Sequence, residues 1–209
     1  MLSAIEALKT LQEGNARYAR GDTQRATTGG KSLRHELVDG QAPFAVILGC
    51  SDSRVPVEIV FDQTLGDLFV IRVAGNIVAP SQIGSVEFAA EHFGTRLVVV
   101  MGHTRCGAVT ATLDSLRQGG RDDASRNLRS IVERIRPSVE ELTMTPLKDD
   151  PDALMHHAVR ANVRASVSHL KAGSESIEQL VEHDGLLVVG AEYSLETGRV
   201  EFFDNVPDA

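Results

Sequence analysis

The chain has 209 residues and a mass of 22.5 kDa, which is enough for one substantial domain whose core needs no disulfide bonds. Asp and Glu number 29 against 21 Lys and Arg, giving a net charge of −8, and this acidic balance argues against nucleic acid or an anionic membrane as partners. The apolar runs are far shorter than the roughly 20 residues of a membrane-spanning helix, and the N-terminus lacks the pattern of a secretory signal. We therefore expect a cytoplasmic protein with no nucleic-acid or membrane partner.

The first segment is predicted to be an amphipathic helix over residues 3–20, with Ser3 and Glu6 forming a capping-box pattern at its start. Residues 22–42 are polar and rich in Gly and Thr, which predicts a loop or an extended arm. Nothing nearby in the sequence offers this helix an apolar partner. The N-terminal helix and arm (residues 1–40) therefore pack either on their own domain or on a second subunit, and composition does not decide between the two.

From Phe44 onward, short apolar runs alternate with helical patterns. Their length and β-branched content predict strands at 44–49, 68–73 and 97–101, and the segments between and after them predict helices at 81–94 and 106–117. Continuous apolar strands separated by helices are typical of a parallel sheet that is covered on both faces.

The C-terminal part is predicted to be helical over most of 124–185, with one helix from Pro151 to Lys171. Segments 186–193 and 199–203 then predict a strand and its hairpin partner at the sheet edge. We expect one α/β domain over residues 1–209, with a mostly parallel central sheet, flanking helices and an antiparallel C-terminal edge strand.

Three potential metal ligands follow the ends of predicted strands. Cys50 comes directly after strand 44–49, and His103 and Cys106 follow strand 97–101. Side chains at the carboxyl ends of neighbouring parallel strands can meet at one point, because the strands lie ~4.8 Å apart. Two thiolates and one imidazole suit zinc, and three protein ligands with one open position form its catalytic arrangement.

The stretch CSDSRVP (50–56) places a carboxylate and a guanidinium beside the first of these ligands. Asp52 and Arg54 can form a bidentate ion pair. A carboxylate held in this way can orient a water molecule at the metal, although the pair could also be purely structural.

Three motifs together, CSDSRVP (50–56), LGDLFVIRVAGN (65–76) and GHTRCG (102–107), resemble those of the β-class carbonic anhydrases. The resemblance is close over residues 40–115 and loose elsewhere. It implies that the three candidate ligands bind one zinc ion per chain and that Asp52 and Arg54 form a dyad beside the metal. The implied reaction is the reversible hydration of carbon dioxide to bicarbonate and a proton.

The resemblance also indicates which type of β-class site this is. Gln41, nine residues before Cys50, matches a glutamine that in one type donates a hydrogen bond to substrate. The other type has a tryptophan three residues before the first cysteine, where this chain has Ile47, and the chain contains no Trp. We therefore expect an open site with water at the zinc, although the counterpart of Asp52 becomes a fourth ligand at low pH in other members.

The family's substrate pocket maps onto Phe69, Ala74 and Phe88, and backbone amides near Gly107 are expected to steady the developing bicarbonate oxygens. Arg72 is expected to form a salt bridge in a loop or at a dimer contact. Members of the family form dimers that exchange N-terminal helices and place each site at the subunit boundary. We therefore expect a homodimer, with a homotetramer as an open alternative.

Three other functions compete with this prediction. A structural zinc site would use Asp52 as a fourth ligand, but it would need neither Arg54 nor Gln41. A cysteine-nucleophile enzyme would use Cys106 activated by His103 and would remain active after zinc removal. A related carbon disulfide or carbonyl sulfide hydrolase would share the ligands, and only substrate assays would separate it.

Overall fold

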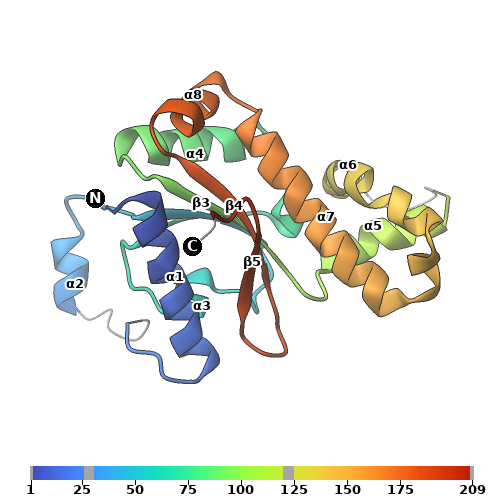
Figure 1. The fold of residues 1–209 in the computed structure, drawn as a ribbon, viewed down its shortest axis with the longest axis horizontal. Helices are drawn as coiled ribbons and strands as arrows, with labels where there is room; N and C mark the ends of the chain where they lie inside the picture. Colours follow the sequence, from blue (N-terminus) through green and yellow to red (C-terminus); the bar gives the residue numbers. More distant parts are fainter. Residues whose placement is uncertain (1, 26–30, 120–124, 208–209) are drawn as a thin grey trace.

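A five-stranded sheet forms the centre of the protein in the computed structural model, which describes residues 2–25, 31–119 and 125–207 (Figure 1). The strand order is β2-β1-β3-β4-β5. The first four strands of this order run parallel and β5 runs antiparallel to β4, so the predicted sheet is confirmed. The strands are β1 Ala45–Gly49, β2 Leu68–Arg72, β3 Leu97–His103, β4 Leu187–Tyr193 and β5 Val200–Asp204.

Strands β1 and β3 are buried along their whole length, as the apolar runs 44–48 and 97–101 predict for central parallel strands. The register aligns their carboxyl ends, because Gly49 of β1 lies beside both Arg72 of β2 and Met101 of β3. The residues that follow β1 and β3 therefore emerge at the same edge of the sheet.

Helices cover both faces of this sheet (Figure 1). Helices α1 and α3 pack on one face, and α4, α7 and α8 pack on the other, while α5 and α6 pack beside α7 at the carboxyl edge. The helices are α1 Ala4–Ala19, α2 Lys31–Glu36, α3 Val57–Val60, α4 Pro80–His92, α5 Gly107–Arg117, α6 Arg126–Val139, α7 Pro151–Lys171 and α8 Glu175–His183. Short 3-10 turns occupy η1 Ala74–Asn76, η2 Glu141–Met144 and η3 Pro146–Asp149. None of the helices in the described ranges is long and apolar enough to cross a membrane.

Helix α1 packs on the sheet of its own chain. The capping box of Ser3 and Glu6 is present, and Leu8 and Leu11 lie in the core cluster between α1 and the sheet. Asn15 also ties the helix to two other elements, since its amide donates to the Val60 carbonyl at 3.1 Å and its oxygen accepts from the Val200 amide at 2.8 Å. The inner face of α1 is therefore satisfied within one chain.

The segment predicted as a loop or arm contains the short helix α2, so that part of the prediction is wrong. The sequence KSLRHE has no Gly or Pro and contains good helix formers, but the surrounding Gly and Thr residues masked this signal. Part of the same segment, residues 26–30, lies outside the described residues.

Candidate metal centre

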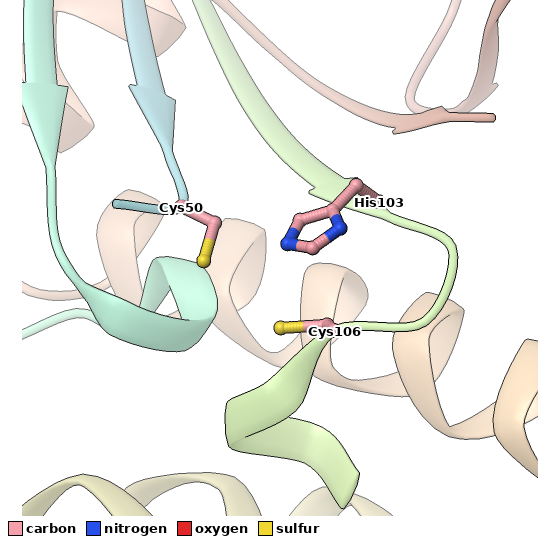
Figure 2. Close-up of side chains that lie close together, drawn as sticks. All are labelled: Cys50, His103 and Cys106. Atoms are coloured by element: carbon pink, nitrogen blue, oxygen red, sulfur yellow. The ribbon is translucent and has the colours of Figure 1, made fainter. Parts of the chain in front are cut away.

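Cys50, His103 and Cys106 converge at the carboxyl edge of the sheet. Cys50 follows β1, His103 ends β3, and Cys106 occupies the N-cap position directly before α5. Their three donor atoms lie within 4.8 Å of one another, and all three residues are buried. Figure 2 shows the two sulfur atoms and the imidazole ring turned toward a common point. The predicted convergence is confirmed.

The imidazole of His103 is oriented for a metal ion. Its Nδ1 lies 2.9 Å from the Thr104 carbonyl oxygen and donates to it, which leaves the lone pair on Nε2. Nε2 is buried and has no hydrogen-bond partner among the described residues, and an unpaired buried acceptor is costly. A zinc ion among two sulfurs and this nitrogen would satisfy it, so these residues fit the metal that the donor set predicts.

The two thiols interact strongly. A hydrogen bond from Cys106 to the Cys50 sulfur lowers the pKa of Cys50, and the same bond, together with burial, raises the pKa of Cys106. The Gly75 amide also donates to the Cys50 sulfur at 3.3 Å. A divalent cation bound between the two sulfurs would allow both to be thiolates.

Asp52 and Arg54 form the predicted bidentate pair. Arg54 Nε donates to Asp52 Oδ1 at 2.9 Å and Nη2 donates to Oδ2 at 2.7 Å. These hydrogen bonds hold the pKa of Asp52 well below its usual range. Asp52 Oδ2 lies 3.9 Å from His103 Nε2, so an ionised carboxylate stands beside the ligand cluster at neutral pH.

Two of the predicted substrate-pocket residues lie close to the ligands. Ala74 begins the η1 turn and precedes Gly75, and Gly107 is the exposed first residue of α5 after Cys106. Gly75 has a φ of +70°, and a Cβ there would come within 2.8 Å of the Ile135 side chain. Glycine therefore suits this turn, because a side chain there would be strained while the amide of residue 75 points to the Cys50 sulfur.

The other three predicted pocket residues lie at the opposite end of the sheet. Gln41 is exposed and precedes β1, and Phe69 pairs with Val46 near the start of β1. Phe88 of α4 is 45% exposed, and its ring centroid lies 6.2 Å from that of Phe69. Five strand residues span roughly 16 Å, so a single chain does not bring these residues to Cys50.

Arg72, Asn162 and Ser166 support the site and were not predicted to do so. Among the described residues Arg72 forms no salt bridge, and it donates instead to backbone carbonyls of the Cys50 loop. From α7, Asn162 donates to the Gly75 carbonyl at 2.8 Å and Ser166 to the Asn76 carbonyl at 3.0 Å. The sequence positions of Asn162 and Ser166 do not predict these hydrogen bonds, because the bonds depend on where α7 crosses the sheet.

A buried carboxyl group lies beside the loop that joins His103 to Cys106. Glu192 of β4 is 6% exposed and lines a cavity of about 250 Å³ together with Thr104, Arg105 and His156. Burial raises the pKa of Glu192 against the opposing charges of His156 and Arg160. The folded chain therefore holds a proton on Glu192 more tightly than the unfolded chain does.

The Glu192→Gln variant is expected to change how stability depends on pH. Because the pKa is higher in the folded state, the stabilisation from protonated Glu192 is complete below the unfolded pKa of about 4.3 and is lost as the pH rises toward the folded value. The free energy of unfolding of the wild type, minus that of the variant, should therefore fall as the pH increases from about 4. Urea unfolding at a series of pH values measures this difference.

Glu201→Gln is the matched control, since Glu201 lies beside Glu192 in the sheet register and contacts the same Arg160. Hydrogen bonds from Arg160 lower the pKa of Glu201, so its contribution to stability is present above the unfolded pKa and is lost as the pH falls. The two difference curves should have opposite slopes. Parallel curves would contradict the assignment for Glu192.

Comparisons with known proteins agree with this architecture. A family model described as carbonic anhydrase matches residues 45–200. Carbonic anhydrase 2 of Mycobacterium tuberculosis strain H37Rv is 37% identical over 204 residues, which cover 97% of this chain and 94% of that protein. Carbonic anhydrase of Mycolicibacterium smegmatis is 38% identical over 204 residues, covering 98% and 95%.

Solved structures give the same result. The β-carbonic anhydrase CafA of Aspergillus fumigatus superposes with a TM-score of 0.73 at 25% identity, covering 98% of this chain and 92% of that one. The Coccomyxa β-carbonic anhydrase in complex with acetazolamide superposes with a TM-score of 0.68 at 25% identity, covering 94% and 86%. With the family match over most of its length and these shared folds, the chain belongs to the carbonic anhydrase family, in its β class.

Proposed function

We propose that this protein catalyses the reversible hydration of carbon dioxide to bicarbonate and a proton, at one zinc ion held by Cys50, His103 and Cys106. The observation that carries the proposal is the buried Cys-His-Cys cluster with an ionised carboxylate 3.9 Å from its imidazole nitrogen. A purely structural site has no need of that carboxylate.

A bound zinc ion supplies a Lewis acid that lets water lose a proton near neutral pH. The chain then has to place that water and the substrate. Asp52 accepts a hydrogen bond from the attacking water and so aims a lone pair at the carbon of carbon dioxide. Arg54 keeps Asp52 ionised and fixes the orientation of its carboxylate by bonding to both oxygens. Ala74 and Gly107 line the substrate position, where first-turn amides of α5 face developing negative charge.

The competing functions find less support. A structural site would need Asp52 as its fourth ligand, but Arg54 occupies both carboxylate oxygens of Asp52. A Cys106 nucleophile would need a lowered pKa, whereas donation to Cys50 raises the pKa of Cys106. No contact among the described residues favours a carbon disulfide or carbonyl sulfide hydrolase.

The direct test is acidification of carbon-dioxide-saturated buffer by the purified protein. We expect acceleration that a zinc chelator abolishes and added zinc restores. Parallel assays with carbon disulfide and carbonyl sulfide should show no turnover. Acceleration that survives complete zinc removal would overturn the proposal. We also infer a cytoplasmic location, since a reducing compartment keeps both cysteines available as ligands.

We further propose that the protein acts as a homodimer in which each site receives Gln41, Phe69 and Phe88 from the second copy. These residues are far from the ligands of their own chain, and Gln41 and the large apolar Phe88 are exposed. The outer edge of β2, which carries Phe69, is unpaired within the described chain. A Sordaria macrospora structure with the same fold is described as a tetrameric β-carbonic anhydrase (TM-score 0.73, 23% identity), and pairing of two dimers is the corresponding larger assembly.

Mixing two defective variants tests whether each site receives Gln41 from the second copy. Gln41→Ala and Cys106→Ser homodimers should each have low activity. In a mixed dimer, the Gln41→Ala chain keeps its ligands and receives Gln41 from its partner. Random pairing should then restore about a quarter of the wild-type sites. If Gln41 serves the ligands of its own chain, co-refolded mixtures will show no recovery.

A further inference from the structure

Arg72 reaches across the end of the sheet to the loop that carries Cys50 and Asp52. It is the last residue of β2 and pairs with Gly49, the residue before Cys50. Its Nε donates to the Cys50 carbonyl at 3.0 Å, and its Nη2 donates to the Asp52 carbonyl at 2.6 Å. One guanidinium therefore holds the backbone on both sides of Ser51.

We propose that Arg72 is a positioning residue that fixes a zinc ligand and the adjacent carboxylate relative to each other and to the sheet. The inference rests on the proposed function, because it concerns the same zinc site. Arg72 acts through Cys50 and Asp52 and touches neither the metal position nor the reacting atoms.

The other contacts of this loop do not supply the same constraint. The Gly75 amide also comes from outside the loop, but it reaches only the Cys50 sulfur and not the backbone. The Arg54–Asp52 pair and the Val55 amide, which also donates to the Asp52 carbonyl at 3.0 Å, are local to the loop. Contacts within the loop determine its shape, but they do not fix its position relative to the sheet. Arg72 comes from a different strand, more than a dozen residues along the chain, and so determines where the loop lies.

The planar guanidinium suits this task. Two N–H groups on one edge of the fork can meet two acceptors at a fixed spacing, whereas a lysine ammonium acts as a point donor. Loss of the fork should let Cys50 and Asp52 shift together. Replacing a residue that holds a metal ligand in place without binding the metal typically lowers metal affinity or activity 10–100-fold.

The test compares Arg72→Gln and Arg72→Lys with the wild type. For Arg72→Gln at saturating zinc, we expect kcat to fall about 10–100-fold while KM for carbon dioxide stays within about threefold. The zinc affinity of the apoprotein, measured by competition with a chromogenic chelator, should fall about tenfold. Arg72→Lys should give intermediate values and keeps the test informative if the glutamine variant folds poorly.

Arg96→Gln is the matched control. Arg96 also donates to two backbone carbonyls, those of Ala90 at 2.9 Å and Thr95 at 3.3 Å, but it lies just before β3, at the opposite end of the sheet. We expect wild-type kcat and zinc affinity from it. Equal losses in Arg96→Gln and Arg72→Gln would overturn the proposal, because they would reflect general stability.

A double variant shows whether Arg72 works through Asp52. If it does, Arg72→Gln should slow Asp52→Asn by no more than about threefold, since the carboxylate to be positioned is already gone. Losses that multiply in full would overturn the positioning of Asp52 by Arg72, and wild-type kcat and zinc affinity in Arg72→Gln would overturn the proposal as a whole. An inactive wild-type holoenzyme would instead refute the proposed function, so the two failures are distinguishable.

Discussion

Replacing Cys106 with serine is expected to remove zinc and to lower carbon dioxide hydration at least about 100-fold. The hydroxyl has nearly the same size as the thiol but does not ionise in the physiological range, so one of the two anionic ligands is lost. Serine is also a favourable residue at a helix N-cap, the position that Cys106 occupies before α5. The fold should therefore survive while the metal site fails. Zinc content per chain and the hydration rate of the same preparation measure both effects.

Cys50→Ser and His103→Gln should also lose zinc and carbon dioxide hydration, because each removes a donor atom from the same cluster. His183→Gln is the control, since His183 is an exposed residue near the end of α8. A Cys106→Ser protein with one zinc per chain and a normal rate would show that Cys106 is not a ligand.

Asp52→Asn is expected to lower kcat about 100- to 1,000-fold while zinc stays bound. The amide matches the carboxylate in shape but carries no charge and is a poor proton acceptor, and a positioned general base typically contributes 10²–10⁴-fold. Zinc content separates this loss from a loss of metal. Full activity of Asp52→Asn would mean that the pair with Arg54 is structural only.

Arg54→Gln should affect the same carboxylate differently. Removing the guanidinium lets the pKa of Asp52 rise toward its ordinary value of about 3.9, since hydrogen bonds from Arg54 are the main cause of its depression. A group with a depressed pKa loses its charge only at low pH, so raising that pKa should move any acid-side loss of kcat/KM to higher pH. The pH profile of kcat/KM measures this shift. Asp184→Asn, which breaks the Arg96–Asp184 pair far from the ligands, should leave the profile unchanged.

The ligand set could be predicted because its geometry follows from two simple features of the sequence. The runs 44–48 and 97–101 are apolar at every position, which is typical of parallel strands buried on both faces. A candidate ligand, Cys50 or His103, follows each run after one glycine. Since carboxyl ends of parallel strands share one edge, Cys50 and His103 had to be neighbours if β1 and β3 are adjacent.

The role of Arg72 could not be predicted, because it depends on the lateral order and register of β1 and β2. Neither is encoded in a local pattern of residues. Gln41 and Phe69 could be placed toward the amino ends of their predicted strands, but which subunit's ligands they serve depends on assembly, which a pattern within one chain does not encode. The helix α2 was missed for another reason, since its six residues are too few to show a period against a polar background.

The metal cluster is assembled from segments that are remote in the chain: 50–54, 72–76, 103–107 and 162–166. Contacts between such distant segments form late in folding, because long loops must close first. The docking of α7 over the turn at Gly75 requires the parallel strands to be in place already. In a zinc finger, metal binding drives folding. Here the ligands lie on a large apolar core of their own, so we expect the chain to fold before it binds a metal ion.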